Sequence, residues 1–136
     1  MKIHHIALIT DDLLEARNFF ESWGLIARDI QIVGERYPGF PTHQYKGMGV
    51  AGNPSLWIMQ PIGLGGPLWE FLKRRGKGTH FHHIAFEVED MALEYVVLHS
   101  SGVVFLRDPF RFENDREIRA LFFDGHGTLI ELVQTF

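Results

Sequence analysis

The sequence predicts an α+β fold: two tandem βαβββ modules whose antiparallel sheets curl around a shared cleft, with the helices outside. The first observation is a repeat, because His4-His5-Ile6-Ala7 returns as His82-His83-Ile84-Ala85. The second is that each copy opens a strand-like run followed by a helix-like run. The third is that the last strand of each half also matches, Leu56–Gln60 against Ile130–Gln134. A long repeat that occurs only twice indicates a pseudo-twofold pair rather than a solenoid.

The first half begins with residues 2–9, whose alternation predicts a strand. Asp12 is a suitable N-cap for the next helix, and Glu15 completes a capping-box pattern. Gly24 stands where a helix C-terminal glycine is expected. Residues Leu25–Val33 are predicted to form a second strand.

The middle of the chain is punctuated by glycine and proline. This density over residues 34–54 predicts short strands joined by turns, around His43–Tyr45. Ser55–Gln60 is predicted to be a strand that Pro61 closes. A short helix is expected from Pro67, with proline in its first turn and basic residues in its last.

The second half repeats this order. His82–Val88 is the predicted strand, and Glu89-Asp90 is expected to cap a helix from about Met91 to Ser100, which Gly102 ends. Further strands are predicted at Val103–Leu106, Arg116–Phe123 and Thr128–Gln134, with a loop or irregular strand at Phe110–Asn114.

Length and composition narrow the classes of protein. The chain has 136 residues, which fits one domain over 1–136: a module of about 1–62, a linker helix of about 63–78 and a module of about 79–136. A net charge of -4 gives no basic excess for nucleic acid. The chain has no cysteine, which excludes disulfides and cysteine zinc sites. No apolar run approaches the ~20 residues of a membrane span, and the start lacks a signal peptide, so we expect a cytoplasmic protein.

The pseudo-twofold relation predicts a site where the halves meet. It places His5 opposite His83, and Trp57 opposite Glu131. Two histidines and one glutamate from three strands, with open positions left, are typical of the facial triad that binds a divalent metal. By strand parity, His4 and His82 should point to the other face and pack under the helices.

Two further groups have alternative interpretations. His43 and Tyr45 are candidate acid–base residues that could line the cleft, or ordinary strand residues. The run Lys73-Arg74-Arg75-Gly76-Lys77 could bind the phosphates of a substrate such as a coenzyme A ester. A solvated helix end whose charges match the helix dipole is the favoured interpretation of this run.

These motifs resemble those of the vicinal oxygen chelate superfamily, which includes glyoxalase I, methylmalonyl-CoA epimerase, extradiol dioxygenases and bleomycin-resistance proteins. The resemblance covers nearly the whole chain, and the epimerase branch is most similar, chiefly from Phe71 to Asp90. It implies that His5, His83 and Glu131 bind a divalent metal such as Fe, Mn, Co, Ni or Zn. In glyoxalase I and the epimerase a fourth ligand comes from the strand where Trp57 stands here. Gln60 could take that role only in a bulged strand.

One departure bears on the reaction. The epimerase uses a glutamate base in its first half, and this chain has no acidic residue between Arg36 and Trp69. The resemblance as a whole implies a metal-dependent enzyme of the glyoxalase/epimerase type that chelates a small carbonyl or acyl substrate through two oxygens and stabilises an enolate-like intermediate. Glu131 would be a ligand and a transient base. The alternatives are an Fe(II) extradiol-type dioxygenase and a metal-free protein that binds a small molecule. A homodimer is a further expectation from the family.

Overall fold

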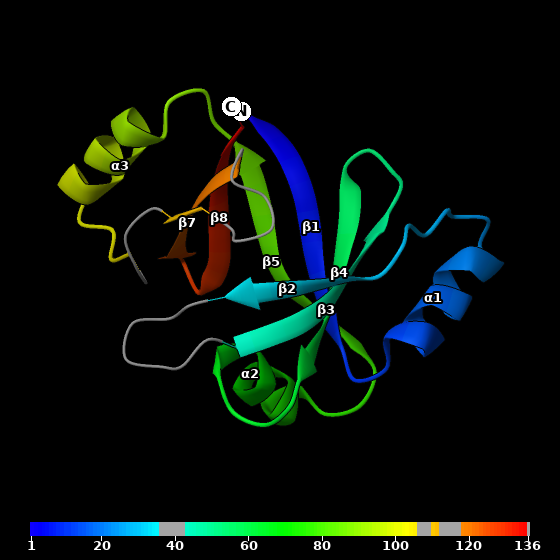
Figure 1. Ribbon diagram of the computed structural model, residues 1–136. Coiled ribbons are helices and arrows are strands. Elements are labelled where there is room, and N and C mark those ends of the chain that lie inside the picture. Colours follow the sequence, from blue (N-terminus) through cyan, green and yellow to red (C-terminus); the bar gives the residue numbers. More distant parts are fainter. Residues whose placement is uncertain (36–42, 106–109, 112–117, 136) are drawn as a thin grey trace.

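The structure is a computed structural model that describes residues 1–35, 43–105, 110–111 and 118–135. Its elements follow one another in two similar series (Figure 1). The first series is β1 (Lys2–Thr10), α1 (Leu13–Ser22), β2 (Gln31–Glu35), β3 (His43–Val50) and β4 (Ser55–Ile62). After α2 (Pro67–Arg75), the second is β5 (Thr79–Glu87), α3 (Met91–Ser100), β6 (Phe110–Arg111), β7 (Ile118–Gly125) and β8 (Thr128–Thr135).

The strands form one mixed, curled sheet, which confirms the predicted fold class. Its order is β2-β3-β4-β1-β5-β8-β7-β6, so each half mirrors the other across the β1–β5 pair. Helices α1 and α3 lie outside the curl on opposite sides, and α2 lies at one end of it (Figure 1). Two pairings differ from the antiparallel expectation, because β1–β4 and β5–β8 are parallel. The helix and two strands between the partners supply the long crossover that a parallel pair needs.

The register between β1 and β5 is itself symmetric. Ile6 pairs with Ile84 at the centre, and the ladder continues on both sides of this pair. On one side His5 pairs with Ala85, and on the other Ala7 pairs with His83. The two halves are therefore related by an axis that passes close to the central pair.

Two histidines interrupt this ladder. On β1, Ile3 and His5 have partners on β5, but His4 between them has none. On β5, Phe81 and His83 have partners on β1, but His82 between them has none. An extra residue on one strand of an antiparallel pair is a β-bulge, which re-aims the side chains around it. The bulges occupy equivalent positions in the two halves.

Each outer helix covers its own half of the sheet. Asp12 and Asp90 cap α1 and α3, and each side chain accepts a hydrogen bond from the backbone amide three residues later, at 3.1 Å. Leu13 and Ala16 of α1 pack on Met48, Val50 and Ile58 of the sheet. The equivalent core lies under α3 and contains Val88, Met91, Leu121, Phe123 and Leu132. No helix in the described part of the chain is long and apolar enough to cross a membrane.

Several strand boundaries differ from the sequence prediction. The expected strand Leu25–Val33 is not continuous in the structure. Ala27 forms an isolated bridge to Val50, and the strand β2 begins later, at Gln31. In the predicted strand Val103–Leu106, Phe105 makes a single bridge to Phe123, and residue 106 lies outside the described residues. Strand β4 runs through Pro61, which lies beyond Met59, the last residue of β4 that pairs with β1. Proline is tolerated at such an edge of a sheet, where fewer ladder hydrogen bonds are required.

Candidate metal centre

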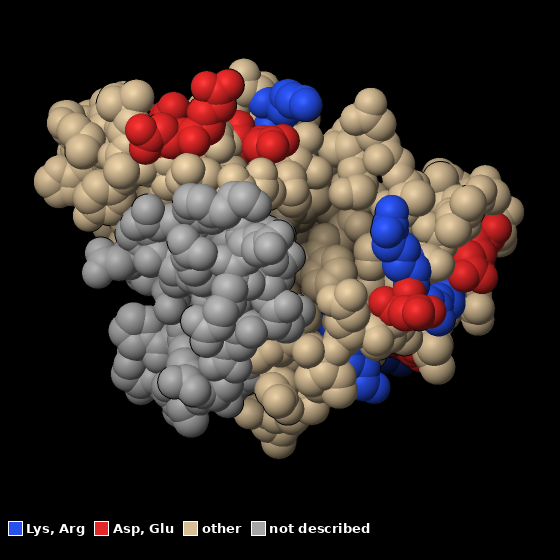
Figure 2. All heavy atoms as spheres, turned by 45° about the horizontal axis from the view of Figure 1, so that its top comes forward, with Lys and Arg blue, Asp and Glu red and all other residues tan. Residues whose placement is uncertain are grey.

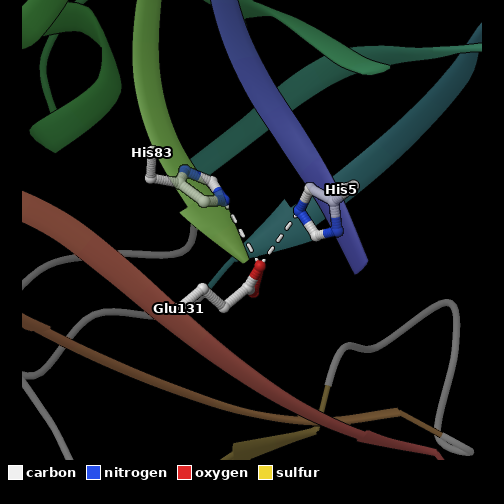
Figure 3. Close-up of side chains that lie close together, drawn as sticks. All are labelled: His5, His83 and Glu131. Atoms are coloured by element: carbon white, nitrogen blue, oxygen red, sulfur yellow. Dashed lines mark hydrogen bonds and ion pairs between the residues drawn. The ribbon is translucent and has the colours of Figure 1, made fainter. Parts of the chain in front are cut away.

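Three adjacent strands bring His5, His83 and Glu131 together (Figure 3). The Nε2 atoms of His5 and His83 lie 3.1 and 3.3 Å from the same Oε1 atom of Glu131. One ligand atom from each residue lies within 4.8 Å of the other two. The sequence placed these residues together, and the structure brings their side chains to one point.

The carboxylate at this point is withdrawn from solvent. Glu131 is 1% exposed and His83 4% exposed. Burial by itself raises the pKa of the Glu131 carboxyl. Hydrogen bonds from His5 and His83, together with the charge of these rings, lower the pKa by more than burial raises it and leave it at about 2. The carboxylate is therefore ionised at neutral pH, and a buried negative charge favours a cation beside it.

The donor set fits a divalent ion. Two neighbouring ligand atoms that each lie about 2.1 Å from one ion are about 3.0 Å apart in octahedral geometry and about 3.4 Å apart in tetrahedral geometry. The two separations to Glu131 match this range. Imidazole nitrogens with one carboxylate oxygen are the ligand types of zinc, iron, nickel, cobalt and manganese sites. His5, His83 and Glu131 would hold such an ion.

Trp57 takes the position in the first half that Glu131 takes in the second. It pairs with Ala7 on β1, just as Glu131 pairs with Ala85 on β5. Its indole offers no lone pair to a metal. The ring lies against Gly47, where an added Cβ would come within 2.1 Å of Trp57 Cζ2. The small residue on β3 thus makes room for a large one on β4.

Gln60 has a different role from that of a ligand. Its side-chain oxygen accepts a hydrogen bond from the backbone amide of Leu13 at 2.9 Å, at the start of α1. Gln134 does the same for Met91 at 3.0 Å, at the start of α3. Helix N-termini leave amides without intrahelical partners, and these two glutamines satisfy one in each half. Sequence reasoning considered Gln60 only as a possible ligand and missed this function.

A cavity of about 340 Å³ opens next to the histidines and Glu131. The exposed face in Figure 2 is hollowed at its centre, with Lys and Arg side chains along one side of the hollow. Most of the cavity wall is apolar, and Arg28 supplies the one permanent positive charge among the described residues that form it. The lining residues are His4, His5, Arg28, Gln31, Val33, Tyr45, Gly49, Val50, Ser55, Leu56, Trp57, Met59, His83, Phe122, Glu131 and Val133.

Strand parity was wrong for His4, which lines this cavity with His5 instead of pointing to the opposite face. The bulge is the physical reason, because it breaks the alternation of side chains at this residue. His82 does contact a helix, as predicted: its ring lies 4.6 Å from that of Phe71 on α2. Burial, with a smaller contribution from His83, lowers the pKa of His82 to about 3.

Of the two candidate acid–base residues, the structure describes the side chain of Tyr45 and not that of His43. Tyr45 is buried and lines the cavity, and its hydroxyl accepts a hydrogen bond from Trp57 Nε1 at 3.4 Å. His43 opens β3, and its side chain lies outside what the structure describes. Sequence reasoning missed Arg28 and Phe122. For Phe122 a signal existed, since it pairs with Glu131 in the β7–β8 hairpin.

The basic run at the C-terminal end of α2 is exposed. Lys73 lies over the Trp69 ring at 4.7 Å and Arg75 over the Phe71 ring at 4.9 Å. Both cations belong to the last turn of the helix, where the dipole favours them.

Comparison with known proteins now defines the family. The model of the Glyoxalase/Bleomycin resistance protein/Dioxygenase superfamily matches residues 4–122. This chain therefore belongs to that superfamily. A comparison with curated protein sequences finds no match.

Solved structures with the same fold include two methylmalonyl-CoA epimerases. One, from Mycobacterium tuberculosis, is 22% identical, with a TM-score of 0.75 over 99% of this chain and 88% of that one. Another, in complex with methylmalonyl-CoA and NH4+, is 23% identical, with a TM-score of 0.74 over 98% and 94%. A hypothetical protein from Bacillus halodurans C-125 is 19% identical, with a TM-score of 0.78 over 99% and 94%. At these identities the likeness establishes the fold.

Proposed function

We propose that this protein is a divalent-metal-dependent enzyme of the glyoxalase/epimerase type that acts on a small carbonyl or acyl compound. The observation on which this rests is the convergence of His5, His83 and Glu131 on one point beside a cavity of about 340 Å³. The epimerase that binds methylmalonyl-CoA supports an acyl substrate class, because it shares the fold.

The residues that line the cavity have different proposed roles. His5, His83 and Glu131 are the proposed ligands, and the chemistry that the ion supplies when bound is Lewis acidity, which stabilises negative charge on substrate oxygens. Glu131 Oε1 is ionised at neutral pH and is the proposed acceptor of a substrate proton. The Tyr45 hydroxyl, which belongs to a residue of the same cavity wall, is a proposed proton donor. Trp57, Met59 and Phe122 keep water away from the reacting carbon.

Arg28 narrows the substrate class. Its guanidinium is the permanent cation among the described lining residues, and a guanidinium binds a carboxylate through two parallel hydrogen bonds. We propose that the substrate has an anionic group in addition to the two oxygens of the carbonyl or acyl end. Carboxylic acids and acyl esters with a second carboxylate are the first compounds to test.

One observation favours a second function. Trp57 at the fourth-ligand position leaves two histidines and one carboxylate, the set that non-haem Fe(II) oxygenases use. Fewer protein ligands leave more coordination positions for substrate and dioxygen. A metal-free protein that binds small molecules in the same cavity is the non-enzymatic alternative.

The first test is metal analysis of the protein purified from medium supplemented with Fe, Mn, Co, Ni and Zn. We expect close to one equivalent in the wild type, a large loss in His83→Ala and none in His99→Ala. The last is a matched control, because His99 is exposed on α3 and its ring stacks on that of Tyr95. Trace metal in the wild type, unchanged by His83→Ala, would leave only the metal-free alternative.

The second test separates the two enzymes. Incubation with candidate acids in deuterated water should place deuterium on the carbon next to the carbonyl, as proton removal at that carbon requires. Oxygen consumption without deuterium uptake would favour the Fe(II) oxygenase instead. We also propose that the protein forms a homodimer. Measurement of its molecular mass in solution tests this.

A further inference from the structure

Each proposed ligand histidine touches the histidine that precedes it. The Nδ1 atoms of His4 and His5 lie 2.8 Å apart, and those of His82 and His83 lie 2.7 Å apart. The ring centroids are 5.1 and 5.0 Å apart, and the planes of both pairs cross at 74°. Two pairs in different surroundings have the same geometry, so the fold itself builds the contact.

The β-bulges make this contact possible. On a regular strand, adjacent side chains point to opposite faces of the sheet and cannot meet. His4 and His82 are the two residues without a partner in the β1–β5 ladder. The bulge in each strand therefore turns neighbouring imidazoles toward one another.

The contact restricts where the protons lie. A hydrogen bond between two Nδ1 atoms requires a proton on one and a lone pair on the other. The Nε2 atoms of His5 and His83 face Glu131. When Nε2 gives its lone pair to a cation, the ring proton must be on Nδ1, and that proton is donated to His4 or His82.

In the protein without a cation, we infer the opposite arrangement of the ring protons. Nε2–H of His5 or His83 then donates to the Glu131 carboxylate, and Nδ1 accepts a proton from the preceding histidine. On going from this arrangement to the cation-bound one, the ligand ring releases its Nε2 proton to solvent and receives the Nδ1 proton of the preceding histidine. The preceding histidine takes up a proton from solvent on its own Nε2, so both rings stay neutral. Both arrangements keep the Nδ1 hydrogen bond. An imidazole partner can accept or donate at this atom, as a backbone carbonyl or a carboxylate cannot.

We propose that His4 and His82 are positioning residues that orient the ligand histidines and exchange a proton with them when the site takes up a divalent cation. This inference rests on the proposed metal site and adds the residues that prepare it. The two partners are not equivalent. Phe71 contacts the ring of His82, whereas His4 lines the cavity. His82 is the more firmly held of the two and should matter more for metal affinity.

The test compares leucine and asparagine at each position, because asparagine Oδ1 or Nδ2 can replace Nδ1 and leucine cannot. Zn²⁺ affinity is measured by competition with a chelator. We expect His82→Leu to bind Zn²⁺ about 10–100-fold more weakly, the usual effect of losing the partner of a ligand histidine. His82→Asn should stay within a few-fold of wild type. His4→Leu and His4→Asn should show the same contrast with a smaller amplitude.

Nitrogen-15 NMR of the histidine rings gives a second measurement on wild-type protein. We expect Nδ1 of His5 and His83 to be protonated with Zn²⁺ and unprotonated without it, with the reverse in His4 and His82. This result does not depend on whether the leucine variants fold. Wild-type protein that binds no metal would overturn the proposed function. Zn²⁺ binding with equal affinity in the leucine and wild-type proteins, or an unchanged Nδ1 state, would overturn this inference alone.

Discussion

Trp57 and Glu131 occupy equivalent places in the two halves of one sheet. Each pairs with the alanine that follows the His-His-Ile sequence, Ala7 for Trp57 and Ala85 for Glu131. The backbone is symmetric at this point, and only the side chains differ. The asymmetry of the proposed metal site is therefore a property of two residues and not of the fold, which makes it accessible to substitution.

A Trp57→Glu substitution should supply a fourth ligand. We expect Zn²⁺ to bind roughly tenfold more tightly or better, equivalent to about 1.4 kcal/mol. The metal-free variant should lose stability because its half-buried carboxylate lacks a partner. Competition with a chelator and thermal unfolding with and without Zn²⁺ measure the two effects. Trp57→Phe, which adds no ligand, is the control. Equal Zn²⁺ affinity in both variants would show that position 57 does not reach the ion.

Gly47→Ala should destabilise the protein. The new Cβ would lie 2.1 Å from Trp57 Cζ2, so the indole or the strand must move. Overpacking of this kind typically costs about 1–3 kcal/mol of unfolding free energy. Gly49→Ala is the matched control on the same strand, because its Cβ would lie 3.5 Å from Arg28 Cδ, an ordinary contact. Urea denaturation should separate the two, and similar midpoints would contradict the tight contact at Gly47.

Gln60→Leu should reduce stability without reducing metal content. The change leaves the Leu13 amide at the start of α1 without its acceptor, and an unsatisfied amide of this kind costs about 1–3 kcal/mol. Gln134→Leu should have a similar effect at Met91. Glu131→Gln is the contrasting variant, since it should lose metal. A loss of metal in Gln60→Leu with normal stability would identify Gln60 as a ligand after all.

Acid should destabilise the metal-free protein in two steps. The pKa of His82 falls from 6.5 to about 3 on folding, so only the unfolded chain takes up this proton between those values and stability falls as the pH drops through them. The pKa of Glu131 falls from 4.5 to about 2, and its contribution is lost over that lower range. Each proton contributes a slope of about 1.4 kcal/mol per pH unit. Urea denaturation after removal of metal should show a shallower slope between pH 6.5 and 4.5 in His82→Asn, and an unchanged slope would contradict the assignment.

Arg28→Met should weaken the binding of anionic ligands and leave the metal site intact. Malonate is a suitable probe, because it has two carboxylates, one for the proposed metal site and one for a guanidinium in the same cavity. We expect roughly tenfold weaker binding, about 1.4 kcal/mol, with unchanged metal content. Quenching of tryptophan fluorescence measures the affinity, since Trp57 lines the same cavity. Equal affinity in wild type and variant would remove Arg28 from substrate recognition.

Much of the fold was predictable because its signals are local or repeated. The N-cap residues Asp12 and Asp90 fixed the starts of α1 and α3, and each side chain makes the expected hydrogen bond. The repeat also predicted that His5 and His83 face each other and that Trp57 corresponds to Glu131. Such inferences need only the alignment of one half of the chain with the other.

What the sequence by itself determined is the doubled architecture and the identity of the three candidate ligands. Only the tertiary structure decided the position of His4, the helix-capping role of Gln60 and the place of Arg28 in the cavity wall. Each depends on contacts between segments far apart in the chain: a bulge exists only relative to the partner strand, and a cap only relative to the helix beside it. The hydrophobic pattern and the turns restrict the register of neighbouring strands, but a pattern along one strand does not show where its partner leaves a residue unpaired.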